Sequence, residues 1–315
     1  MRSGFIKTLL ELAENDERIF LLVGDVGYSL VEPFVEKFPG RFVNIGIAEQ
    51  NMTGIATGLA LSGKIVFTYS LANFPTLRCV EQIRNDICYH EASVKIVTSG
   101  AGLAYGALGP THHVIEDMAV MRALPNMTVL APCDPVEAAL ATQAAVKLDG
   151  PCYLRLAKTG DPSVHMTIPD FQIGKAITIR EGIDLTLVAC GGIILNVIEA
   201  AEQLEQQGIR ARVLSMHTVK PLDTGAVLAA ARETGSIMSI EEHSIVGGLG
   251  SAVAETLAES GISNVAFHRM GINDCFCSEV GSQEYLRRRH SLSIKDMVEK
   301  AVHLLGNRLK EYELA

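Results

Sequence analysis

Short apolar runs alternate with helical segments along most of this chain of 315 residues, and this alternation restricts the possible folds more than any other feature. Residues 5–14 have apolar side chains at helical spacing, and a continuous apolar run follows at residues 19–23. Strands of about five residues separated by helices are typical of a parallel β-sheet covered on both faces. The first half predicts further strands at 42–47, 65–69, 94–98, 128–130 and 152–156, and helices at 49–61, 76–89, 115–123 and 135–148.

Glycines and prolines interrupt this pattern between residues 158 and 182, and the alternation then resumes. The second half predicts strands at 185–190, 210–215, 236–241 and 265–269, helices at 195–207, 223–231 and 251–260, and terminal helices from Ser282 and Ser293. We therefore predict two three-layer α/β domains, residues 1–160 and 183–315, joined by a linker at 161–182. Each domain contains a mainly parallel sheet covered by helices, and the length is sufficient for two cores.

Composition and charge exclude several classes of function. The net charge is −9, from 27 Lys and Arg against 36 Asp and Glu, which argues against a nucleic-acid or anionic-membrane surface. The longest apolar run, residues 185–198, is too short to span a membrane. The first residues contain neither a signal core nor a transit-like stretch, so we expect a cytoplasmic protein. Seven scattered cysteines predict reduced thiols rather than a disulfide framework.

The segment 42–52, Phe-Val-Asn-Ile-Gly-Ile-Ala-Glu-Gln-Asn-Met, contains the leading candidate for a catalytic residue. It predicts a buried strand followed by a helix, with Glu49 in the first helical turn. An isolated carboxylate there merely complements the helix dipole, an effect worth about 0.3–1 kcal/mol. Glu49 therefore gains significance only from the motifs that accompany it.

A glycine cluster, Gly247-Gly248-Leu249-Gly250, precedes the predicted helix 251–260. Backbone N–H groups at such a position can bind phosphate. However, the spacing matches neither the dinucleotide fingerprint nor the Walker loop, so we predict close packing of the helix on the sheet instead. The residues 24–27, Gly-Asp-Val-Gly, are ordinary turn chemistry at a strand end.

The order of motifs resembles the pyrimidine-binding and C-terminal domains of the transketolase family of thiamine diphosphate enzymes. The resemblance covers nearly the whole chain, and Gly-Ile-Ala-Glu-Gln is its most specific part. The segments that carry it are Gly24-Asp25, Ile45-Gly46-Ile47-Ala48-Glu49-Gln50-Asn51, Tyr69-Ser70 with Phe74, Gly109-Pro110-Thr111-His112-His113, Ala131-Pro132-Cys133-Asp134-Pro135 and Glu241-Glu242-His243-Ser244 with the glycine cluster.

One motif of the full-length family is absent from this chain. Full-length members hold the cofactor diphosphate and its Mg²⁺ through Gly-Asp-Gly and a downstream Asn, and no Gly-Asp-Gly occurs here. The resemblance therefore implies one subunit of a split transketolase. Its partner would be an N-terminal subunit that carries the diphosphate-binding domain and the Mg²⁺ ligands, and the expected assembly is an α2β2 heterotetramer in which this chain dimerises.

The resemblance also assigns roles to residues. Glu49 is expected to hydrogen-bond the cofactor aminopyrimidine and to favour its imino tautomer, with burial keeping the carboxyl pKa high. Phe74 is expected to stack on the pyrimidine ring, and His112 to contact substrate and exchange protons. The further expected cofactor contacts are Ile47, Gln50 and Arg78, and the further expected substrate contacts are His113, Arg155, Arg2 and Ser29.

The sequence departs from the family pattern at two places, and these departures leave the identity of the substrate undecided. Leu108 stands where an acidic residue that contacts substrate hydroxyls is expected, and Gly100-Ala101 replaces a basic residue that meets a substrate phosphate. Arg2, Arg155 and Lys158 are candidate anion contacts, and each is equally explained as a paired or solvated charge. The competing metal hypothesis, with His112, His113, Glu116 and Asp117 as ligands, is disfavoured because adjacent histidines on a turn seldom converge on one ion.

The expected function is transfer of a two-carbon ketol unit from a ketose, a sugar phosphate or a related anionic sugar, to an aldose. The enzymatic alternatives are a ligase like 1-deoxy-xylulose-5-phosphate synthase and the β subunit of a 2-oxoacid dehydrogenase. A non-catalytic assembly or regulatory module is the alternative from another class, because fold does not imply function. The joint presence of Glu49, Phe74 and His112 argues against that module.

Overall fold

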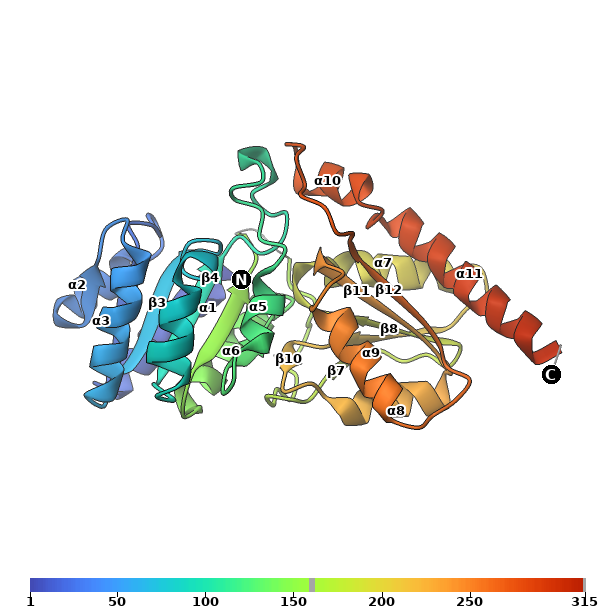
Figure 1. The fold of residues 1–315 in the computed structure, drawn as a ribbon, viewed down its shortest axis with the longest axis horizontal. Coiled ribbons are helices and arrows are strands. Elements are labelled where there is room, and N and C mark those ends of the chain that lie inside the picture. The colour runs from blue at the N-terminus through green and yellow to red at the C-terminus, as the bar shows by residue number, and fades with distance from the viewer. Residues whose placement is uncertain (159–161, 314–315) are drawn as a thin grey trace.

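Two α/β domains lie side by side in the computed structural model, which describes residues 1–158 and 162–313, the side chains of 307–313 excepted (Figure 1). The sheet of the first domain has the strand order β10-β5-β6-β4-β3-β1-β2, and all neighbours pair in parallel except β10 with β5. Its strands are β1 (Ile19–Val23), β2 (Phe42–Asn44), β3 (Ile65–Leu71), β4 (Val94–Ser99), β5 (Thr128–Leu130), β6 (Cys152–Leu156) and β10 (Thr218–Lys220).

Helices cover this sheet as the apolar pattern predicts. They are α1 (Arg2–Asn15), α2 (Glu32–Lys37), α3 (Glu49–Leu61), α5 (Asp117–Ala123) and α6 (Pro135–Lys147). Helix α1 packs closely on α6, since a Cβ added to Gly4 would lie 2.4 Å from the Pro135 carbonyl oxygen. Phe5 and Leu9 of α1 are fully buried in the core beneath. The predicted helix 76–89 consists instead of three short pieces: a 3₁₀ turn Leu77–Cys79, α4 (Val80–Gln82) and a π-helical stretch Ile83–Cys88.

The second domain contains a five-stranded sheet with the order β12-β11-β8-β9-β7, in which only β7 is antiparallel to its neighbour. Its strands are β7 (Ile177–Arg180), β8 (Leu185–Ala189), β9 (Ala211–Ser215), β11 (Ser236–Ser244) and β12 (Ala266–Ile272). Its helices are α7 (Ile194–Glu205), α8 (Thr224–Glu233), α9 (Leu249–Glu259), α10 (Gln283–Arg289) and α11 (Ile294–Glu313). The two-domain α/β prediction is therefore confirmed.

Two edge strands were not predicted. Strand β7 lies within the range 161–182 that we predicted as a linker, and β10 follows β9 after two residues. Both are short and antiparallel, so neither carries the apolar run that marks a parallel strand. Strand β10 comes from the second half of the chain but completes the sheet of the first domain. The two domains are thus interlocked through backbone hydrogen bonds.

The predicted buried strand 42–47 is wrong in its length and in its burial. Strand β2 ends at Asn44, and Gly46 takes a positive φ of 75°, which terminates it before α3. It pairs only with β1 and forms the edge of the sheet. Val43 is therefore 40% exposed although its apolar neighbours suggested a core position.

A buried ion pair lies where the domains meet. Nε of Arg155 in β6 donates to Oδ2 of Asp117 at 2.6 Å, and both side chains are at most 3% exposed. The other end of the Arg155 guanidinium donates to the carbonyl oxygens of Val114 and Glu242 at 2.8 and 3.2 Å. Burial alone would raise the pKa of Asp117, but the charges of Arg155 and His243 hold it below its ordinary value. This pair joins the first domain to β11 of the second.

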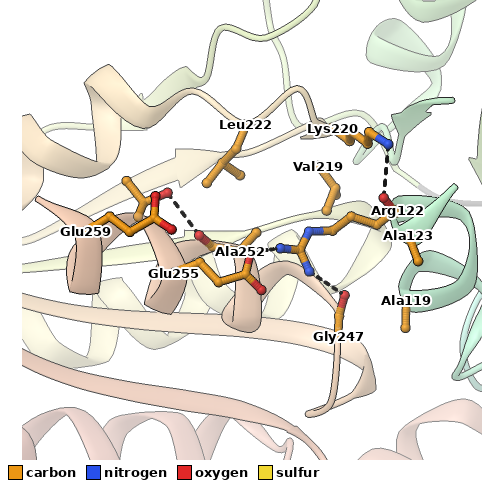
Figure 2. A pocket seen from close by; sticks show the side chains of 11 residues that line it. Ala119, Arg122, Ala123, Val219, Lys220, Leu222, Gly247, Ala252, Glu255 and Glu259 are labelled. Carbon is orange, nitrogen blue, oxygen red and sulfur yellow. Dashed lines mark hydrogen bonds and ion pairs between the residues drawn. The ribbon is translucent and has the colours of Figure 1, made fainter. Parts of the chain in front are cut away.

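A hollow of about 530 Å³ lies on the same junction, between α5, β10 and α9 (Figure 2). Its two cations are already engaged within the protein. Arg122 donates to the Gly247 carbonyl oxygen at 3.0 Å and pairs with Glu255. Lys220 donates to the carbonyl oxygens of Arg122 and Leu124. The hollow therefore lies between the domains, and the polar ends of both cations are already engaged by groups of the protein.

The glycine cluster at residues 247–250 serves the packing of α9, as predicted. The carboxylate of Glu241 accepts the backbone N–H groups of Leu249 and Gly250, both at 2.7 Å. A Cβ at Gly248 would lie 2.1 Å from Oε2 of that carboxylate. The anion at this helix N-terminus is thus an internal side chain, which leaves no place for a phosphate.

No helix in the part of the chain that the structure describes is long and apolar enough to cross a lipid bilayer. The seven cysteines are all free thiols, and all except Cys275 are buried.

Lys95 gives the fold a testable dependence on pH. Its side chain is fully buried in β4, and Nζ donates to the carbonyl oxygens of Leu148 and Gly150 at 2.7 and 2.6 Å. Burial lowers the pKa of Lys95 to about 8. Between about pH 8 and the unfolded-state pKa of about 10.4, Lys95 is protonated more often in the unfolded chain than in the folded chain. The contribution of Lys95 to folding stability therefore rises with pH in this window.

We expect wild type to gain about 1–2 kcal/mol of unfolding free energy relative to Lys95→Met when the pH is raised from about 8 to about 9.5. Urea denaturation of both proteins at each pH measures this difference. The buried cysteines are present in both proteins, so their titration contributes to both unfolding free energies and cancels in the difference. A difference that stays constant with pH would contradict the assignment.

Candidate active site

The carboxyl ends of β1, β3 and β4 lie next to one another, because these strands are parallel neighbours in the sheet. Ligands of open α/β sheets bind at this edge, outside the carboxyl ends of the strands. Gly24 follows β1, Ser70 lies at the end of β3, and Ser99 ends β4. The loops that leave these strands carry the candidate residues.

Glu49 is the first residue of α3 and is only 1% exposed. Its Oε2 accepts a hydrogen bond from Nη1 of Arg78 at 2.7 Å. Its Oε1 lies beside Gly24, where a Cβ would be 3.5 Å from that oxygen and 3.2 Å from Oγ of Ser70. The absence of a side chain at Gly24 therefore leaves room next to the carboxylate. On one side, therefore, the surroundings of Glu49 are an ion pair with Arg78 rather than apolar side chains.

Arg78, Phe74 and His112 form a continuous contact series from Glu49. The Arg78 guanidinium lies over the Phe74 ring, 4.8 Å from its centroid. The Phe74 and His112 rings meet edge to face, with centroids 5.6 Å apart. Gln50 donates to the Arg78 carbonyl oxygen at 3.1 Å and fixes the backbone there. The structure thus brings these five predicted residues together.

Asn73 holds the turn that carries His112. Its Nδ2 donates to the carbonyl oxygens of Thr111 and His113, both at 2.8 Å. His112 is half-buried and its Nδ1 lies 3.0 Å from Oγ1 of Thr111. His113 is 3% exposed, with its ring nitrogens 3.1 and 3.3 Å from the carbonyl oxygens of Cys277 and Gly106. His112 is therefore the histidine available to a ligand, and His113 is a structural link to the second domain.

Ile47 and Ser29 lie on the open side of the site. Ile47 is 79% exposed directly before Glu49. Ser29 is exposed with a positive φ of 61°, and its N–H donates to Glu32 at 2.7 Å. Near it, Asn44 donates to Oδ1 of Asp25 at 3.0 Å, and this bond, with a second from Tyr28, lowers the pKa of Asp25.

The structure does not bring Arg155 to this site. Its buried ion pair with Asp117 and its bonds to two carbonyl oxygens account for its position, so we correct the predicted substrate contact to a structural role. Arg2 is half-buried beside the hydroxyl of Tyr69, where its charge opposes the increase in the Tyr69 pKa that burial causes. The competing metal hypothesis is also disfavoured, because two of its four ligands, His113 and Asp117, are engaged with other groups.

The sequence assigned no role to several polar residues at the strand ends. Oγ of Ser70 is buried without a hydrogen-bond partner among the described residues. Oδ1 of Asn73 is in the same state. A polar residue that directly ends an apolar run was the available signal, because strand ends in a parallel sheet face the ligand site.

Comparison with protein families identifies both halves of the chain. Residues 1–160 match the transketolase pyrimidine-binding domain, and residues 174–297 match the transketolase C-terminal domain. This chain belongs to the transketolase family. Membership implies dependence on thiamine diphosphate and classifies the chain as part of a transferase.

Several of the similar proteins are subunits of two-chain enzymes. The chain is 40% identical over 309 residues to a 6-deoxy-6-sulfo-D-fructose transketolase subunit of Clostridium sp. (strain MSTE9), covering 98% of this chain and 95% of the relative. It is 42% identical over 261 residues to an apulose-4-phosphate transketolase subunit of Phocaeicola vulgatus (strain ATCC 8482), covering 82% and 84%. A solved structure titled "Split gene transketolase, inactive beta4 tetramer" superimposes with a TM-score of 0.87 at 39% identity, covering 97% of each chain. The chain is therefore a split transketolase subunit that works with a partner subunit.

The structural role of Arg155 predicts a large loss of stability on its removal. In Arg155→Met the buried Asp117 carboxylate loses its counter-charge, so we expect unfolding to become easier by about 3–5 kcal/mol. The double variant Asp117→Asn with Arg155→Met removes the unpaired charge and should recover part of this loss. Chemical denaturation measures both, and a Michaelis constant near that of wild type in the double variant would exclude substrate binding by Arg155.

Proposed function

We propose that this chain supplies the pyrimidine-binding half of a thiamine diphosphate site and that Glu49 activates the cofactor there. The observation that carries this proposal is the position of Arg78. Its planar guanidinium donates a hydrogen bond to Glu49 and lies over the Phe74 ring. These are the two contacts that the resemblance assigns to the aminopyrimidine ring.

The residues present fit the pyrimidine end of the cofactor. A planar N–H donor already occupies the space between Glu49 and Phe74, and Gly24 leaves the carboxylate accessible on its other side. Oγ of Ser70 is a buried polar atom without a partner among the described residues, beside the same carboxylate. The side chain of Arg78 is 45% exposed, so it can swing away without leaving the surface.

Thiamine diphosphate supplies, when bound, the nucleophilic thiazolium carbon that carries the two-carbon unit from donor to acceptor. The residues of this chain orient the cofactor and exchange protons with it. Glu49 shares a proton with the pyrimidine ring, and its burial excludes water from that hydrogen bond. His112 lies next to Phe74 and provides an imidazole that can exchange a proton with sugar hydroxyls near neutral pH.

An anionic ketose is the donor that we propose. The names of the two relatives specify a sulfo-fructose and a sugar phosphate, both of which are anionic sugars. Gly100 is necessary in this chain, since a Cβ there would lie 2.1 Å from the Tyr105 ring. A basic side chain is thus excluded at residue 100, and Arg2, beside Tyr69 at the same edge of the sheet, is the proposed contact for the anionic end.

The remaining half of the site belongs, in this proposal, to a partner subunit. That second chain would bind the diphosphate and Mg²⁺ in an α2β2 assembly in the cytoplasm. The exposed apolar residues Val43, Ile47 and Ile55 support a partner on the β2 and α3 side, because they are 40%, 79% and 38% exposed. Apolar residues clustered at such an edge are typical of protein interfaces.

Glu49→Gln tests the catalytic role. The amide keeps the size of the side chain but cannot share a proton, so we expect turnover to fall by about 10²–10⁴-fold with the fold intact. The assay uses the complete two-subunit enzyme with a ketose donor and an aldose acceptor. Glu36→Gln, the same substitution at an exposed position of α2, is the matched control. Turnover of Glu49→Gln within a few-fold of wild type would remove Glu49 from this role.

A cofactor titration tests the division of the site between two chains. We expect weak thiamine diphosphate binding to this chain alone and strong binding, at least about 100-fold tighter, with the partner and Mg²⁺ present. Isothermal titration calorimetry measures both affinities. Equal affinities would contradict the half-site. Substrate trials on the assembled enzyme separate ketol transfer from the synthase-like alternative, which would consume pyruvate rather than a ketose.

A further inference from the structure

A cysteine, a glutamate and a histidine meet at the junction of the two domains. One ligand atom from each of Cys133, Glu137 and His165 lies within 4.8 Å of the other two. Sγ of Cys133 is 4.0 Å from Nε2 of His165, which is 2.9 Å from Oε1 of Glu137. Cys133 and Glu137 are fully buried and the His165 side chain is 8% exposed. All three residues are therefore shielded from bulk water.

The cluster is separate from the proposed catalytic site. Cys133 and Glu137 lie where β5 leads into α6, and β5 is three strand spacings from β3 in the sheet. At about 4.8 Å per spacing, this corresponds to about 14 Å. His165 comes from the segment that joins the domains. The three ligands thus come from the first domain and from the connection to the second.

Two buried carboxylates lie here. Asp134 accepts the backbone N–H groups of Glu137, Val164 and His165, and Glu137 accepts the N–H of Cys133 and pairs with His165. Backbone N–H groups satisfy these oxygens without neutralising their charge, and a divalent cation at this position would offset it.

Ser215 is a further buried polar side chain at this position. It lies at the end of β9, and its hydroxyl is next to the Cys133 thiol and the Glu137 carboxylate. Its Oγ makes no well-directed hydrogen bond to either group or to another described residue, so it can hold a water in the cluster.

We propose that Cys133 Sγ, Glu137 Oε1 and His165 Nε2 bind a zinc ion, with a water held by Ser215 Oγ in the fourth position. A thiolate, a carboxylate and an imidazole form a ligand set typical of tetrahedral zinc. Binding displaces the thiol proton of Cys133 and the proton that His165 shares with Glu137, and both protons pass to solvent.

The ion would fix the connecting segment to both domains. His165 anchors that segment to the start of α6, and the water on Ser215 extends the link to β9. The role that we assign to the ion is to hold this connecting segment in place, separately from the proposed cofactor chemistry.

Metal analysis of the full chain tests the site. The protein is stripped with a chelator, dialysed against micromolar zinc and assayed by mass spectrometry for bound metal. We expect one zinc ion per chain and a raised melting temperature. Cobalt(II) in place of zinc should give a thiolate charge-transfer band and the intense visible bands of a tetrahedral ion.

Matched variants identify the ligands. Cys133→Ser and His165→Gln should each weaken zinc binding by at least 10-fold and abolish the zinc-dependent rise in melting temperature. Cys275→Ser and His90→Gln remove an exposed cysteine and an exposed histidine and should retain full binding. Absence of zinc from the wild-type chain, or full binding in Cys133→Ser, would overturn the proposal. If Cys133→Ser does not fold, lack of the thiolate band in the wild-type cobalt spectrum overturns it instead.

Discussion

Parallel pairing of β3 with β1 and β4 is the constraint on which the rest of this structure depends. It places the carboxyl ends of three strands at one edge, so that the loops after them converge although they are far apart in the sequence. Glu49 reaches this edge from the start of α3, while Phe74, Arg78 and His112 reach it from the loops after β3 and β4. Each contact in the site follows from that arrangement.

The second domain supports the site without contributing a side chain to the Glu49 contact series. Its Glu242 accepts the N–H of Leu103 at 2.6 Å and pairs with Arg287, and the Cys277 carbonyl oxygen lies 3.1 Å from His113. The loop between β4 and α5 is therefore held from both sides. Strand β10 adds a backbone connection at the opposite end of the sheet. A change in the packing of the second domain will thus be transmitted to His112 through this loop.

The sequence was sufficient to predict the long, regular elements and insufficient for the short ones. Helix α1 has apolar side chains at helical spacing and the parallel strands are continuous apolar runs, whereas the three residues of β10 are too few to show a pattern. Glu49, Phe74 and His112 were predicted from family motifs, and the structure brings them together. Arg155 and His113 were predicted as substrate contacts and have buried partners in the structure, which the sequence does not reveal. The convergence of Cys133 with His165 depends on the path of the connecting segment and has no local sequence signal.

Arg78 also affects how this chain folds before it assembles with its partner subunit. A carboxylate that is 1% exposed would cost folding energy if it stood unpaired, and hydrogen bonds to charged groups are worth about 1.5–3 kcal/mol. By pairing with Glu49, Arg78 allows the newly made chain to fold in advance of its cofactor. In the proposed site, a pyrimidine ring that binds to Glu49 would have to displace the Arg78 guanidinium, so cofactor binding would compete with an internal ion pair.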